Sequence, residues 1–156
     1  MKAHLLLAAA LLASPMAASS RATASRVSQP LPFVTLAQGT QSAWPYGETH
    51  LVITNENLWK RVWRLHAPGA PLPAVDFATE DVYAVILGPK PTTGYTVATV
   101  GLTDTGSTVH WDIHAIEPGP SCTTLPIQTK PFHFVKAPKT GLLALIFQVN
   151  ETISCL

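Results

Sequence analysis

Hydrophobic and polar residues alternate along most of the chain with a period of about two, which predicts β-strands separated by turns. Residues 82–88 are almost entirely apolar, which indicates a strand covered on both faces. Strand-like runs of this kind occur at 33–36, 50–54, 82–88, 96–100, 108–116, 132–135 and 142–149. The turn signals between them recur about every ten residues, so we predict a mainly β domain, a sandwich or open barrel of about seven short antiparallel strands.

The hydrophobic period changes to that of a helix at about residues 55–66. Apolar residues at 58, 59, 62, 63 and 65 predict an amphipathic helix of about three turns. Asn55 or Thr54 can cap its start, and Pro68-Gly69 follows its end. We expect Trp59 and Trp63 to pack onto the sheet, because they lie one helical turn apart.

The N-terminus has the order of a secretory signal peptide. Lys2 precedes an apolar run from Leu5 to Ala13, and small residues follow. This run is shorter than the roughly 20 residues that a membrane span needs. We therefore predict a signal peptide over 1–24, with cleavage after 18, 19 or 24, and secretion or a periplasmic or cell-envelope location. A flexible leader over 25–32 and a single β-rich domain over 33–156 complete the predicted organisation.

Charge is scarce along the chain, since only 12% of residues are charged. Of 10 Lys and Arg and 9 Asp and Glu, removal of residues 1–24 takes away Lys2 and Arg21, leaving 8 basic against 9 acidic residues. A balance near neutrality without a basic run argues against nucleic-acid binding. No later stretch of about 20 apolar residues occurs, so no membrane span is expected after processing.

The two cysteines, Cys122 and Cys155, gain importance from the predicted export, because exported proteins fold in oxidising compartments. A disulfide between them would join the C-terminus to a mid-chain loop and would stabilise the fold by about 3–4 kcal/mol in the chain-entropy model. The alternative is two free thiols, one of them reactive.

Catalytic and metal-binding patterns are weak. No nucleophile elbow, phosphate loop or dinucleotide fingerprint occurs, and Ser121 and Cys122 are isolated possible nucleophiles, so we expect no enzyme activity and no cofactor. His110, Asp112 and His114 would share one face of a strand and could hold a metal. The two histidines would lie about 13 Å apart along a regular strand, however, which favours a solvated polar face.

Trp44 and the segment 90–95 remain as candidate binding elements. Trp44 can equally cover a sheet edge. The segment has a proline that favours a turn, a glycine that can adopt positive φ and a large aromatic ring at its end, in the order Lys90, Pro91, Thr92, Thr93, Gly94, Tyr95. It is therefore either a well-specified corner without a partner or a partner-binding loop.

The sequence from Val82 through this segment resembles the C-terminal domain of PrcB, a protease-complex subunit among exported bacterial proteins. The similarity includes Trp59 and Trp63 in the predicted helix, residues 73–77 before the buried strand and residues 129–133 before a late strand. It extends over about residues 55–148.

The resemblance implies a non-catalytic module that associates with or stabilises an exported protease or another secreted or cell-envelope protein. Lys90 to Tyr95 would contribute to the partner surface, with Tyr95 as an aromatic anchor. Pro91 to Tyr95 is also similar to the first inhibitory loop of chagasin-type cysteine-peptidase inhibitors, and Lys130-Pro131-Phe132 loosely resembles their third loop. Inhibition of a cysteine peptidase is therefore the alternative function.

Overall fold

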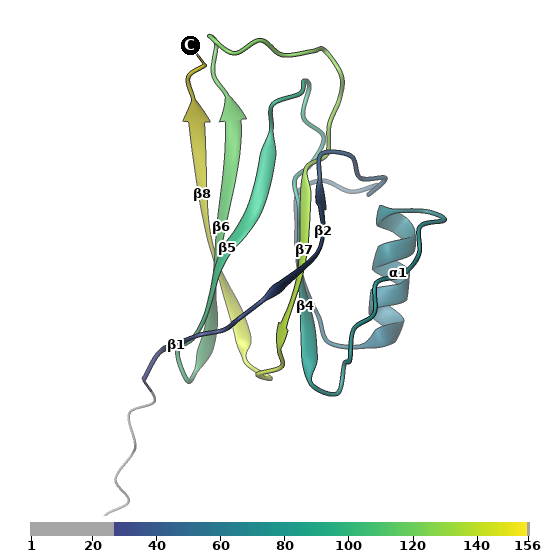
Figure 1. Cartoon of the computed structure of the whole chain (residues 1–156), viewed down its shortest axis with the longest axis vertical. Helices are drawn as coiled ribbons and strands as arrows, with labels where there is room; N and C mark the ends of the chain where they lie inside the picture. Colours follow the sequence, from purple (N-terminus) through teal and green to yellow (C-terminus); the bar gives the residue numbers. More distant parts are fainter. Residues whose placement is uncertain (1–26, 156) are drawn as a thin grey trace, which may run out of the picture.

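A computed structural model describes residues 27–155, and the predicted signal peptide over 1–24 lies outside these residues. The described chain forms two four-stranded sheets (Figure 1). Sheet A contains, in spatial order, β1 (Gln29–Pro30), β5 (Thr96–Asp104), β6 (Thr108–Pro118) and β8 (Leu143–Ile153). Sheet B contains β2 (Val34–Gly39), β7 (Phe132–Pro138), β4 (Glu80–Ile86) and β3 (Thr49–Ile53). The predicted mainly β fold is confirmed as a sandwich.

The strand β4 explains why residues 82–88 are apolar at nearly every position. Tyr83 and Val85 face sheet A, where they pack with Trp111 and other residues of the first hydrophobic core. Val82 and Ala84 point the other way, into a second core beneath the helix. The central strand is thus covered on both faces, as the sequence predicts.

The helix α1 (Glu56–His66) covers the outer face of sheet B and makes the fold a three-layer structure (Figure 1). Asn55 caps it, since its Oδ1 accepts a hydrogen bond of 2.9 Å from the Leu58 N–H. Trp59 and Trp63 are buried against Phe134 of β7, with ring centroids 5.7 and 5.8 Å away. The predicted helix and its packing face are confirmed.

Two details of the strand arrangement differ from the sequence prediction. The predicted strands were antiparallel, but β8 pairs with β6 in parallel. The chain leaves β6 for β7 in the other sheet, and the short turn at 139–142 returns it to sheet A in the direction of β6. The predicted flexible leader also contains β1, in which Gln29 pairs with Asp104. A two-residue pairing leaves no hydrophobic pattern that a sequence could show.

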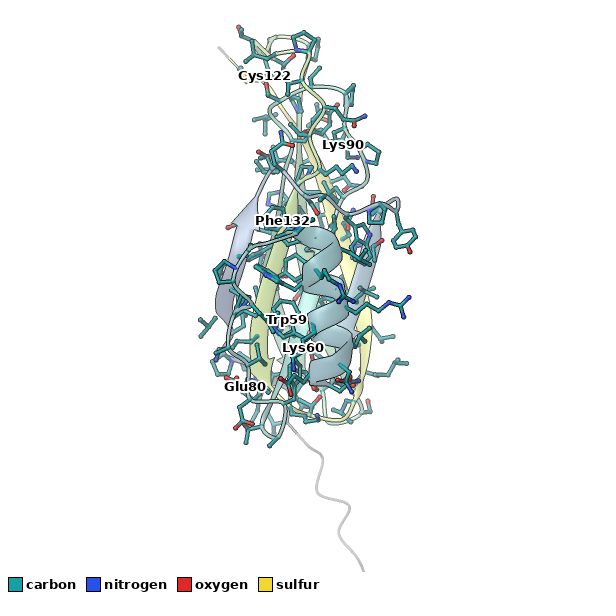
Figure 2. All side chains as sticks on the ribbon, turned by 90° about the vertical axis from the view of Figure 1, so that its right-hand side faces the viewer. Trp59, Lys60, Glu80, Lys90, Cys122 and Phe132 are labelled. Atoms are coloured by element: carbon teal, nitrogen blue, oxygen red, sulfur yellow. A yellow bond between two sulfur atoms is a disulfide. The ribbon has the colours of Figure 1, made fainter. Side chains whose placement is uncertain are left out.

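The described residues contain no helix that is both long enough and apolar enough to span a membrane. The helix α1 has 11 residues, and its outward face carries charged side chains such as Lys60 (Figure 2).

Candidate functional site

The segment 90–95 lies at one end of the sandwich, beside the long loop 119–131 that joins β6 to β7. Figure 2 shows Lys90 and Cys122 toward this end of the molecule and Glu80 toward the other. We call these two loops together the disulfide end. The structure thus brings the segment singled out in the sequence next to the proline-rich loop.

Backbone and threonine hydrogen bonds join the two loops. Lys90 and Thr129 form an isolated antiparallel bridge, with N–H···O distances of 2.8 and 2.9 Å. Thr93 and Leu125 also bond in both directions: the Thr93 N–H donates to the Leu125 carbonyl, and Thr93 Oγ1 accepts from the Leu125 N–H. Thr129 Oγ1 donates to the Thr92 carbonyl at 2.9 Å. The threonines therefore brace the loop and are not free for a partner.

Gly94 satisfies a backbone requirement of this turn. Its φ is +97°, a backbone angle that residues other than glycine rarely adopt, and an added Cβ would lie 3.0 Å from Pro118 Cβ. Glycine is therefore needed here both for conformation and for close packing, as its place in the turn signal suggests.

Tyr95, the predicted aromatic anchor, is half-buried, so part of its side chain is accessible. The ammonium of Lys90 lies 5.6 Å from the centroid of its ring, within the range of a cation–π contact. The same ammonium is 3.9 Å from Glu117 Oε1. Lys90 and Tyr95 thus form one cationic and aromatic patch, while Pro91 and Gly94 are exposed.

Cys122 and Cys155 form the disulfide that the sequence left open. It ties the loop 119–131 to the residues that follow β8. Beside it, Gly119 donates its N–H to the Ile153 carbonyl at 2.8 Å, and Cys155 donates its N–H to Ser121 Oγ at 3.0 Å. Disulfides of this kind are typical of oxidising compartments.

Sequence reasoning missed two exposed apolar residues of the same loop. Leu125 is 56% and Ile127 50% exposed, on either side of Pro126. The signal was present as two large aliphatic residues inside a loop rich in proline and polar residues. Leu125 bonds to Thr93 of the segment 90–95, so the disulfide end is partly apolar.

The structure places His110, Asp112 and His114 on the outer face of sheet A, opposite the inward-facing Trp111. His114 Nε2 lies 2.8 Å from a carboxylate oxygen of Glu151, and the His110 ring packs against Phe147 at 4.8 Å. Within residues 27–155, no three His, Cys, Asp or Glu side chains are grouped to hold a metal ion.

Trp44 and the Lys130-Pro131-Phe132 segment, the remaining candidates from the sequence, are packed against the rest of the domain. Trp44 is buried against the second core and donates its indole N–H to Thr49 Oγ1 at 3.0 Å. Pro131 and Phe132 are buried, and Lys130 Nζ donates to the Trp44 carbonyl at 2.8 Å. The Lys130-Pro131-Phe132 segment therefore does not form an exposed loop.

These elements define a β-sandwich domain with one covering helix and a loop end held by a disulfide. Residues 82–138 match the family model described as PrcB C-terminal, and the resemblance to the PrcB family is thereby confirmed for this segment. The match runs from β4 through β7 and includes both loops of the disulfide end; the sequence resemblance was expected over a longer stretch, about 55–148. No curated protein and no solved structure matches the chain significantly.

Proposed function

We propose that this protein is an exported, non-catalytic module that binds and stabilises an exported protease, and that the disulfide end is its partner surface. The observation that carries the proposal is the match of residues 82–138 to the PrcB C-terminal family, since resemblance to PrcB implies a subunit of a protease complex. The matched segment includes Lys90 to Tyr95 and the whole of loop 119–131.

The physical character of the disulfide end supports a binding role. Hydrogen bonds between the loops and the Cys122–Cys155 bond hold the surface in one shape. A preorganised surface loses little conformational entropy on binding. Its accessible groups include the exposed Leu125 and Ile127 and the partly exposed Lys90–Tyr95 patch, a mixture of aliphatic, aromatic and cationic groups suited to a protein interface.

Export is the second part of the proposal. The disulfide supports an oxidising compartment, and the N-terminal pattern of residues 1–24 supports secretion or a periplasmic or cell-envelope location. Mass spectrometry of the protein from the extracellular or periplasmic fraction should find an N-terminus after residue 18, 19 or 24. Recovery of an intact Met1 would contradict export by cleavage.

Binding is tested by capture of proteolytic activity from the exported proteins of the native cells. The immobilised chain should retain a casein-degrading activity, and adding the soluble chain should lengthen the thermal half-life of that activity. Leu125→Asp with Ile127→Asp should abolish both effects. Val34→Asp is the matched control, since Val34 is also highly exposed but lies near the opposite end of the sandwich. Equal retention by the variant and the control would exclude the disulfide end as the partner surface.

Inhibition of a cysteine peptidase is the competing function. The burial of Pro131 and Phe132, and the internal hydrogen bonds of Thr92 and Thr93, leave few groups free to enter a peptidase cleft. Titration of a papain-like peptidase with the micromolar chain should leave its activity unchanged. Stoichiometric loss of activity would favour the inhibitor function over the stabilising one.

A further inference from the structure

The strand β8 forms one edge of sheet A, and among residues 27–155 only β6 pairs with it. It is 11 residues long and pairs with β6 in an unbroken register from Leu143 to Ile153. Its sequence contains no proline, lysine or arginine. Such a long, regular edge offers a row of backbone donors and acceptors to another strand.

The other three sheet edges in residues 27–155 carry features that hinder such pairing. The edge strand β1 has two residues, one of them Pro30, and pairs only with Thr103 and Asp104 of β5. The rest of that edge is formed by β5, which has a register break between Thr99 and Gly101, and β2 has one between Thr35 and Ala37. The edge strand β3 has only five residues. Short strands, prolines and bulges are the usual protection of edges, and β8 has none of them.

The side chains of β8 are exposed in a way that is unusual for a strand beside a core. Ile146 shares the inner face with Trp111 yet is 46% exposed. On the outer face, four consecutive positions carry large apolar side chains, all of them exposed: Leu143, Leu145, Phe147 and Val149. The outer face of the edge is therefore open, whereas its inner face is covered in part, since Ala144 packs on the first core and Gln148 hydrogen-bonds to His50 and Glu48.

The order of these residues is complementary to itself. When two β8 strands pair antiparallel with Ile146 opposite Ile146, Leu143 faces Val149 and Leu145 faces Phe147 of the second copy. All four outward apolar residues then meet apolar partners across the strands. Residues 143–149 contain no charged residue, so no like charges face each other.

We propose that the β8 edge binds the β8 edge of a second copy of this chain, in an antiparallel register centred on Ile146. The two sheets A become one continuous eight-stranded sheet across a two-fold axis. A two-fold interface requires a surface that complements itself, which is the property of residues 143–149. This self-association is independent of the protease-binding role, because the disulfide end stays outside the pairing.

The mass of the purified full-length chain in sedimentation equilibrium tests the association. At tens of micromolar, the chain should have twice the monomer mass, and Leu145→Lys with Val149→Lys should be monomeric. Val100→Lys is the matched control: Val100 is also exposed on sheet A, but its strand β5 lies on the far side of β6 from β8, so the dimer should persist. Unchanged near-ultraviolet circular dichroism would show that the variants are folded.

Disulfide trapping tests the register. Cα atoms of directly opposed residues in an antiparallel pair lie about 4.5–5.5 Å apart, within the disulfide range. Ile146→Cys should therefore form a covalent dimer with itself under mild oxidation. Leu143→Cys should not, because in this register its two copies lie roughly 20 Å apart. A mixture of Leu143→Cys and Val149→Cys should form a mixed dimer.

Each outcome decides the proposal. A protein that is monomeric at all concentrations overturns the proposal. If the lysine variants of such a monomer also fail to bind a protease, the β8 edge is assigned to that protease instead. A dimer that Val100→Lys disrupts as fully as the β8 lysine variants overturns edge pairing in favour of stacking of the outer faces, because Val100, Phe147 and Val149 line one hollow of that face. A dimer with trapping at other positions overturns the register centred on Ile146.

Discussion

His133 joins the two sheets through a hydrogen bond to Thr99. The Thr99 backbone N–H of β5 donates to His133 Nδ1 of β7 at 2.8 Å, next to the register break between Thr99 and Gly101. The other ring nitrogen, Nε2, lies 2.9 Å from Thr35 Oγ1. Because Nδ1 accepts, the neutral ring with its proton on Nε2 fits this environment. Protonation of Nδ1 would break the link between the sheets.

The first prediction is that stability declines in weak acid. Burial lowers the pKa of His133 and lowers the pKa of His66 from 6.5 to about 4. The unfolded chain therefore binds more protons than the folded chain below pH 6.5, so protonation favours unfolding. The free energy of unfolding should be constant above about pH 7 and fall between pH 6.5 and 5, by at most about 1.4 kcal/mol per pH unit for each histidine.

Urea denaturation at pH 7.5, 6.0 and 5.0 measures this decline. His66→Gln serves as the test variant, because its amide can replace the 2.7 Å hydrogen bond between His66 Nδ1 and Ser42 Oγ without titrating. The variant should lose stability at pH 7.5 but show a shallower pH dependence. An equal slope in both proteins would mean that His66 is not responsible. The interval above pH 5 avoids Glu80, whose pKa is already lowered by Lys136.

The second prediction concerns the disulfide. Cys122→Ser with Cys155→Ser removes a cross-link across a sequence separation of 33 and should lower the free energy of unfolding by about 3–4 kcal/mol. The local effect should be greatest in loop 119–131, because the bond anchors it to the end of β8. Hydrogen exchange should be faster at the amides of residue 122 and Leu125, with β4 amides protected until global unfolding. Uniform acceleration across the chain would indicate only a global effect.

The third prediction concerns a buried carboxylate. Asp81 is only 3% exposed, and no donor in residues 27–155 forms a hydrogen bond with its Oδ1, which lies 3.4 Å from Lys139 Nζ. Removing the cation would leave the carboxylate uncompensated, so Lys139→Met should cost about 1–3 kcal/mol of unfolding free energy. Adding Asp81→Asn should recover part of that loss, since the amide carries no charge. Additive losses in the double variant, measured by chemical denaturation, would exclude coupling between these residues.

Much of the fold follows from hydrophobic periodicity because burial of one face imposes a simple pattern. The helix is predicted well since Asn55 caps it and Trp59 and Trp63 recur on one face. The doubly covered strand β4 is equally evident, because both neighbouring layers require apolar side chains. The parallel pairing of β6 with β8 is not evident from the sequence, because the periodicity of a strand is the same in either direction. The direction of β8 depends instead on which sheet the chain enters.

The disulfide end was predictable only in part. The turn at Gly94 has a local signature in proline, threonine and glycine, so its conformation could be inferred from the sequence. The contact of this turn with loop 119–131 could not be inferred, because the bonds from Thr93 to Leu125 and from Lys90 to Thr129 join residues more than thirty positions apart. The exposure of Leu125 and Ile127 likewise depends on that long-range arrangement. Local signals specify turns, whereas the composition of a surface depends on tertiary structure.

The fourth prediction separates backbone strain from packing at the disulfide end. Gly94→Ala places a Cβ 3.0 Å from Pro118 Cβ at a residue with φ of +97°, whereas Gly141→Ala has φ of +69° and open space around its Cβ. Both substitutions should cost the roughly 1–2 kcal/mol of a left-handed alanine, and Gly94→Ala should cost more because Pro118 must also move. Denaturant midpoints of the two variants measure the difference. Equal losses would show that the contact with Pro118 relaxes freely and that glycine is needed here only for its backbone conformation.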